Sequence, residues 1–146
     1  MKFLGINESQ ADLIFRMLFS SIFLGLGMEH LFSDDLLQHL MPGWVFAPEL
    51  ASYISGVILL AGGSMILLGY HVRLGASILS VFLIVVTIAV HAPDILKKPD
   101  DSNWMWIILQ RSNFVKNVCL LGVCFKLFFY TPGNYSLEAW LKRRHR

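Results

Sequence analysis

The residues of this sequence that could do chemistry are a few ionisable or amide side chains set inside long apolar segments. Histidine titrates near neutral pH, so it can give or take a proton, while lysine and asparagine can donate hydrogen bonds to carbonyl oxygens. These types together favour a site that binds a polar group and exchanges protons with it. The candidate ligand-binding residues are Glu29, His30, Glu49, His91, Lys116 and Asn117.

Other kinds of chemistry find little support in the sequence. Glu29 and His30 are adjacent, but one carboxylate and one imidazole are a weak sign of a metal site without partners at helical spacing. There is no glycine-rich phosphate loop, nucleophile elbow or zincin motif. Cys119 and Cys124 are five residues apart, which on one helix turns the thiols about 140° away from each other, so we expect two small core residues. The sequence therefore predicts no metal and identifies no catalytic residue.

The amino-acid composition indicates the class of protein to which these residues belong. The chain has 146 residues, of which 55% are hydrophobic and only 15% charged, whereas a soluble domain has roughly 25% charged residues. That is too little polar surface to cover a small soluble core. The net charge of +2 is too small to indicate a nucleic-acid partner. We therefore expect a single integral membrane domain over residues 1–146, with membrane lipids as its surroundings.

Four segments are long and apolar enough to cross a bilayer, which takes about 20 residues per helix. The fold class that follows is all-α, a transmembrane four-helix bundle. Residues 33–40 resemble a short helix in the membrane interface, and the Trp-rich segment 103–109 either lies in the interface or extends the fourth helix outward. The predicted spans are residues 11–32, 48–70, 73–91 and 112–130.

The distribution of Lys and Arg predicts the orientation. Most of these residues flank the side of the membrane that holds both chain ends, which places the two termini in the cytoplasm and the protein in the inner membrane as a multi-pass protein. Arg16, Arg73 and Lys126 then gather at the inner side as structural charges.

The same topology brings Glu29, Glu49, His91 and Lys116, from four different helices, to the outer leaflet. A charge at the centre of a span costs about 2.5–3.5 kcal/mol and less near its ends. Carboxylates beside a cation in such surroundings are expected to pair and to form a pocket. The alternative is that each side chain reaches separately into the headgroup layer and only holds the helices together. The sequence leaves both interpretations open.

The sequence also resembles the DoxX family of small four-helix membrane proteins, and the resemblance covers nearly the whole chain. It rests on the order of several short motifs rather than on any one of them. The motifs are an Arg in the first span, Phe-Leu-Gly-Leu-Gly-Met-Glu-His-Leu-Phe at 23–32, Ser-Gly at 55–56 with Ala-Gly-Gly at 61–63, Leu-Leu-Gly-Tyr-His-Val-Arg at 67–73, Val-His-Ala-Pro at 90–93, Lys-Asn at 116–117 and Pro-Gly-Asn-Tyr-Ser-Leu at 132–137.

The resemblance implies a role in membrane redox chemistry. The family takes its name from a membrane subunit of a thiosulfate:quinone oxidoreductase, and related members are associated with redox complexes and oxidative-stress defence. The leading hypothesis is therefore a quinone- or redox-linked accessory subunit, with a quinone as candidate cofactor and a redox subunit as partner. The alternatives are a non-enzymatic lipid-binding or assembly factor and an intramembrane isomerase that uses a Glu/His pair. Whether the chain is an enzyme, and its oligomeric state, stay open.

Overall fold

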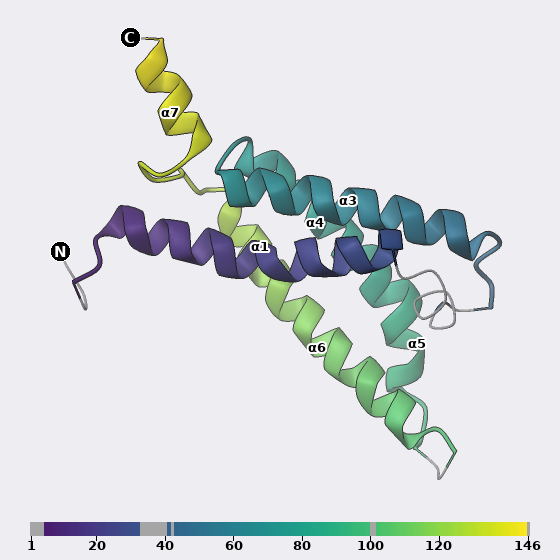
Figure 1. The fold of residues 1–146 in the computed structure, drawn as a ribbon. Helices are drawn as coiled ribbons and strands as arrows, with labels where there is room; N and C mark the ends of the chain where they lie inside the picture. The colour runs from purple at the N-terminus through teal and green to yellow at the C-terminus, as the bar shows by residue number, and fades with distance from the viewer. Residues whose placement is uncertain (1–4, 33–40, 42, 100–101, 146) are drawn as a thin grey trace.

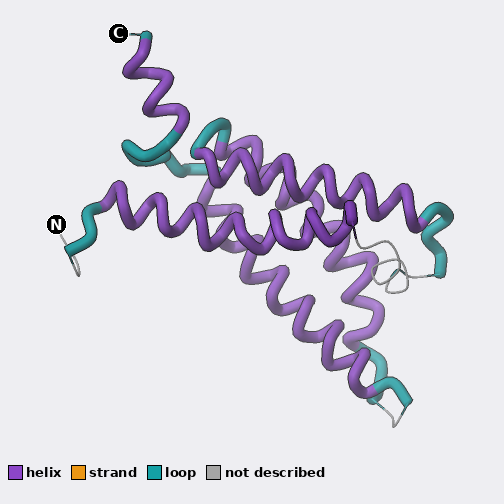
Figure 2. The backbone as a smooth tube through the Cα atoms, in the orientation of Figure 1, coloured by secondary structure: helices purple, strands orange, loops and turns teal. Residues whose placement is uncertain are grey.

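The computed structural model describes residues 5–32, 41, 43–99 and 102–145, and these form helices joined by short connections, without a strand. This confirms the predicted all-α fold class. In chain order the helices are α1 (Glu8–Phe32), α3 (Pro48–Leu68), α4 (Val72–Val86), the π-helical turn η1 (Thr87–His91), α5 (Ala92–Ile95), α6 (Trp104–Leu127) and α7 (Leu137–Arg144). Figure 1 shows their arrangement, and Figure 2 separates the helices from the connections.

Three of these helical segments are long and apolar enough to cross a membrane: Glu8–Phe32, Pro48–Leu68 and Val72–Ile95, the last of which joins α4, η1 and α5. They correspond to the first three predicted spans and differ from them by a few residues at the ends. The predicted short helix over residues 33–40 lies outside the described residues.

The fourth predicted span, residues 112–130, corresponds to α6, but this helix begins at Trp104 and ends at Leu127. The Trp-rich segment therefore extends the fourth helix, one of the two alternatives left open by the sequence. With 24 residues α6 is long enough to cross a bilayer. It carries Arg111, Lys116 and Lys126, however, and is not among the three segments that are apolar enough to be candidate spans. Its crossing of the membrane stays a prediction.

The helices pack in chain order: α1 against α3, α3 against α4, and α4 against α6. In Figure 1, α1 and α3 run side by side, whereas α5 and the beginning of α6 leave the direction of that pair and diverge from it. The helices are thus close at the end where α3 turns into α4 and separate toward the other end. This divergence determines which of the candidate site residues can meet.

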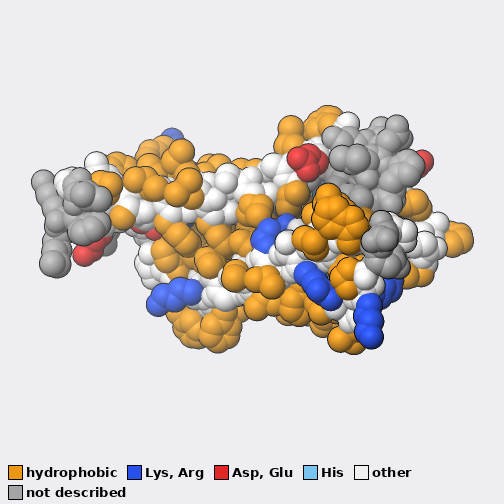
Figure 3. Space-filling view, turned by 90° about the horizontal axis from the view of Figure 1, so that it is seen from below, with side chains coloured by type: hydrophobic (Ala, Val, Ile, Leu, Met, Phe, Trp, Pro, Cys, Tyr) orange, Lys and Arg blue, Asp and Glu red, His pale blue; other side chains and the backbone are white. Residues whose placement is uncertain are grey.

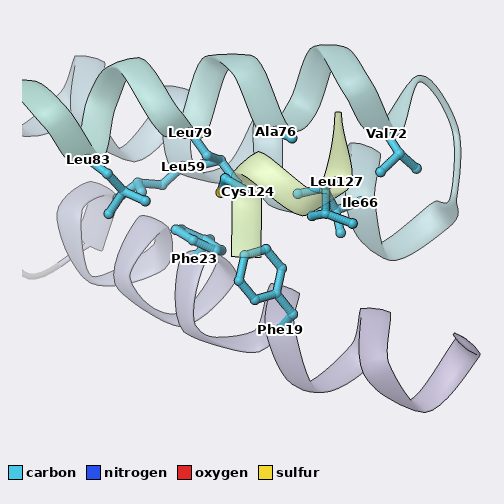
Figure 4. Packing of buried hydrophobic residues seen from close by; sticks show 10 residues of the cluster. All are labelled: Phe19, Phe23, Leu59, Ile66, Val72, Ala76, Leu79, Leu83, Cys124 and Leu127. Carbon is cyan, nitrogen blue, oxygen red and sulfur yellow. The ribbon is translucent and has the colours of Figure 1, made fainter. Parts of the chain in front are cut away.

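The core lies where the four long helices are close. Figure 4 shows Phe19 and Phe23 of α1 pointing toward side chains of α3, α4 and α6, among them Leu59, Leu79 and Cys124. Cys124 is buried there, as predicted, but Cys119 is exposed on the outer side of α6, so the prediction that it is a core residue is wrong. The outer surface is rich in apolar side chains, visible in Figure 3, and suits contact with lipid.

Glycines allow the helices to approach closely at two points. Gly27 of α1 faces Gly56 of α3, and Gly62 of α3 faces Gly75 of α4. A Cβ atom built at Gly75 would lie 2.9 Å from the backbone oxygen of Gly62 and 2.9 Å from the Cβ atom of Met65. Neither atom is the end of a flexible side chain, so the two backbones would have to separate. Small residues at such crossings are typical of helix packing in membranes.

We therefore expect Gly75→Ala to destabilise the protein even though alanine is the better helix former. The expected loss is about 1 kcal/mol or more in the free energy of unfolding in detergent, because overpacking a tight contact costs about 1–3 kcal/mol. Gly122→Ala on α6 is the control, since a Cβ there meets nothing within 4 Å. Equal stability of the two variants would contradict the close contact between α3 and α4.

Candidate functional site

The candidate site residues fall into three separate groups in the structure. His91, Lys116 and Asn117 lie on η1 and α6. Glu29, His30 and Glu49 lie at the far end of the α1–α3 pair, and Arg16 lies at the opposite end of the bundle. The groups have different hydrogen-bonding partners.

His91 is the centre of the first group. Its Nδ1 atom is hydrogen-bonded to Oε1 of Gln110 on α6. A side-chain amide oxygen only accepts hydrogen bonds, so Nδ1 carries the proton and Nε2 of the neutral ring is left as an acceptor. Gln110 is almost fully buried and thereby fixes the ring, while His91 itself is half-buried. This histidine is oriented by one nitrogen and keeps the other for further bonding.

The local backbone explains how His91 reaches α6. Residues Thr87–His91 form a π-helical turn, and the backbone N–H of Ala92 bonds to the carbonyl of Thr87, five residues back. Pro93 follows, and because proline has no N–H it cannot continue the α-helical ladder. Isolated π turns occur frequently at functional sites. The hydroxyl of Thr87, in the same turn, is buried and has no hydrogen-bond partner in the described part of the chain.

Lys116 and its neighbours add a cation to this group. Lys116 is half-buried, and its Nζ donates a hydrogen bond of 2.9 Å to Oδ1 of Asn113, one turn earlier on α6. Its charge lies within electrostatic range of His91, as does that of Asp94. Asn117 is buried on the same helix. A protonatable ring and a cation therefore stand near each other between η1 and α6.

Asp94 connects the short helix α5 with the beginning of α6. Its Oδ2 accepts a hydrogen bond of 2.7 Å from the indole Nε1 of Trp106 on α6, and Oδ1 pairs with Lys97. The carboxylate is buried, so these partners compensate for its removal from water. The indole bond holds the short helix α5 against the start of α6 and so keeps the preceding π turn in place.

The second group does not join the first. Glu29 and Glu49 are exposed, and no hydrogen bond or ion pair between described residues connects either of them with His91 or Lys116. Pairing of these four residues, one of the two interpretations that the sequence left open, is therefore not found among the described residues. His30 instead bonds through Nδ1 to Oγ of Ser52 at 3.0 Å, and this hydroxyl donates to the carbonyl of His30, also at 3.0 Å. The exchange holds α1 against α3.

At the other end of the bundle, Arg16 is completely buried and all three of its guanidinium nitrogens are bonded. Nε pairs with Oδ2 of Asp12 at 3.1 Å, Nη1 donates to the carbonyl of Leu67, and Nη2 donates to the carbonyl of Tyr135 at 2.7 Å. Asp12 also accepts the backbone N–H of Gly133. Arg16 is thus a structural charge, whereas Arg73 and Lys126 are exposed.

The sequence alone did not identify four residues that hydrogen-bond side chains in these groups, namely Asp12, Ser52, Asp94 and Gln110. A signal existed for Asp12, because it lies four residues before Arg16 and so on the same helix face. Gln110 was missed because the fourth helix was expected to begin at residue 112. Asp94 follows a proline, where the helix was expected to have ended.

Comparison with known proteins identifies the family of the chain. The family model described as DoxX matches residues 11–92, more than half of the chain, so the protein belongs to the DoxX family. No curated protein matches the sequence, and no solved structure matches it. The matched region contains Arg16, His30, Glu49 and His91, whereas Gln110 and Lys116 lie beyond it.

The buried Arg16 leads to a stability prediction. Arg16→Leu would leave the Asp12 carboxylate and two carbonyl groups without their donor, and breaking a buried ion pair in this way costs about 3–5 kcal/mol. We expect a correspondingly large drop in the free energy of unfolding in detergent. Lys126→Gln, which removes an exposed charge, is the control and should change stability little. The double variant Asp12→Leu/Arg16→Leu should recover part of the loss, and a double variant as unstable as the sum of the two single ones would contradict this coupling.

Proposed function

We propose that this DoxX-family protein is a redox-linked accessory subunit of the inner membrane that holds a quinone head group beside His91. The observation that carries the proposal is the hydrogen bond between His91 and Gln110, which fixes the imidazole by Nδ1 and leaves Nε2 without a partner among the described residues. The position of this pair at one end of two long helices suits the ring of a lipid-soluble ligand that enters from the bilayer.

The donor set around His91 fits the two carbonyl oxygens of a quinone. Lys116 has N–H groups beyond the one bonded to Asn113, and an ammonium group is a strong donor to a carbonyl oxygen. The Thr87 hydroxyl is buried without a partner in the described residues, so a ligand oxygen within reach would satisfy it. Neither Glu29 nor Glu49 is needed in this arrangement, since both lie on the separate α1–α3 end.

The residues of this chain would bind the head group and handle protons. A bound quinone would supply the redox chemistry, taking up two electrons and two protons as it becomes a quinol. Neutral His91 accepts a proton at Nε2 and, once protonated, donates one from the same atom. The chain has no side chain that carries electrons, so a partner subunit would have to supply them.

The proposal is tested by the quinone content of the purified full-length protein. We expect quinone to co-purify and His91→Ala to lower its retention about tenfold, the effect of losing roughly 1.4 kcal/mol from one hydrogen bond. Nε2 accepts this bond from a quinol hydroxyl or, once protonated, donates it to a quinone carbonyl oxygen. Gln110→Leu should weaken retention too, because it frees the ring. His30→Ala is the matched control, since His30 is half-buried but bonded to Ser52. Retention that is the same in all three variants would contradict the site.

The ligand that co-purifies also separates the two other hypotheses. Phospholipid without quinone would favour a lipid-binding or assembly factor with a purely structural polar group. A sterol-like or isoprenoid ligand would favour an intramembrane isomerase. Mass spectrometry of the extracted small molecules distinguishes the three outcomes in one measurement.

The orientation of the protein is a second part of the proposal. Both termini are expected to face the cytoplasm because of the Lys and Arg flanking that side. A reporter enzyme fused after Arg146 should then be active only in its cytoplasmic form, and one inserted after Lys98 only in its periplasmic form. The opposite pattern would place His91 at the cytoplasmic side.

A further inference from the structure

A second polar feature lies at the opposite end of the molecule from His91. A cavity of about 500 Å³ opens between the beginning of α4, the segment 130–132 and helix α7. His71, Arg73 and Lys142 contribute basic groups to its lining, and Tyr130, Thr131 and Glu138 contribute the other polar groups.

The charges around this cavity leave one cation uncompensated. Lys142 is paired with Glu138 at 2.6 Å, so these two largely cancel. The guanidinium of Arg73 makes no ion pair or hydrogen bond with any residue that the structure describes. A guanidinium offers several N–H groups in one plane, which suits the oxygens of a phosphate. The unpaired guanidinium of Arg73 therefore makes the cavity suitable for an anion with several oxygens.

A second observation is independent of these charges. Tyr130 lines the same cavity, and its hydroxyl is a buried polar atom without a hydrogen-bond partner among the described residues. Leaving such a group unsatisfied is unfavourable, and a ligand oxygen that reached it would remove this cost. An unpaired cation thus lines the cavity, and one of the other lining residues carries an unsatisfied donor.

The cavity also lies where phospholipid headgroups are found. It borders Gly69–His71, the tight turn between two helices that are long and apolar enough to cross a membrane, so this end belongs at the surface of the bilayer. Helix α7 carries Trp140, followed by Lys142, Arg143 and Arg144. Tryptophan is enriched at membrane interfaces, and basic clusters beside a span attract anionic lipids.

We propose that this cavity binds the phosphate of an anionic phospholipid, with Arg73 as its main contact and Lys142 and Tyr130 beside it. The site is independent of the proposed quinone site, because it lies at the other end of α4. A free phosphate ion offers the same oxygens, so the experiment must distinguish the two sources.

The experiment uses the full-length protein in detergent with two probes, phosphatidylglycerol and inorganic phosphate. We expect native mass spectrometry to show retained phosphatidylglycerol, and Arg73→Gln to lower its retention about fivefold, the effect typical of one basic residue near a membrane surface. Thr131→Trp should have a similar effect, because it fills the cavity without removing a charge. Lys126→Gln is the matched control, since Lys126 is an exposed cation that does not line the cavity.

The outcomes separate as follows. Retention of phosphatidylglycerol that falls in Arg73→Gln and Thr131→Trp but not in Lys126→Gln supports the lipid site. If inorganic phosphate displaces the lipid at equal concentration, the ligand is the free ion, and the proposal of a phospholipid site is overturned. Retention in both test variants equal to that of Lys126→Gln would overturn the site altogether. Arg73 and Thr131 are exposed, so melting curves of the variants should match that of the unchanged protein.

Discussion

The buried guanidinium of Arg16 is the interaction on which the rest of this bundle depends. A charge in apolar surroundings must be paired and its N–H groups satisfied. Arg16 meets this demand with Asp12 on its own helix, the carbonyl of Leu67 in the last turn of α3 and the carbonyl of Tyr135 beyond α6. The last carbonyls of a helix have no partner within it, so one residue satisfies what the end of α3 would lack. Three segments distant in the sequence are thereby fixed to one another.

Gly69 shows how closely this interaction constrains the chain. It caps α3 with a φ of 64°, a conformation that favours glycine. A Cβ atom there would lie 2.9 Å from Nη1 of Arg16 and 2.6 Å from the Cβ atom of Ser136. Ser136 in turn caps α7 by accepting the N–H of Ala139. The turn, the cap and the buried charge therefore require one another, and this end of the bundle is closed, while the helices diverge toward the other end.

That divergence explains what the sequence could and could not predict. Hydropathy was enough to find the four long helices but not the polar helix α7, and the predicted topology gave each charged residue an expected depth in the membrane. Depth does not say in which direction a side chain points around the bundle, however, and a shared pocket would require all four helices to turn these side chains toward one point. Because α6 packs against α4 and leaves the α1–α3 pair, Glu29 and Glu49 cannot meet Lys116. The pairing of His91 with Gln110 also required the true beginning of α6, which tryptophans at residues 104 and 106 obscured.

Arg16 and His91 differ in how much hydrogen-bonding capacity is open to a ligand, and this separates a structural from a functional polar group. Every nitrogen of Arg16 has an acceptor within the chain, and the side chain is completely buried, so its remaining N–H groups are out of reach of a ligand. His91 has one nitrogen bonded to Gln110 and one unused, and the Thr87 hydroxyl in the same π turn has no partner in the described residues. A buried donor or acceptor left unsatisfied lowers stability unless another molecule completes it. The unused capacity beside His91 is therefore the physical reason to place ligand binding there and not at the more completely buried charge.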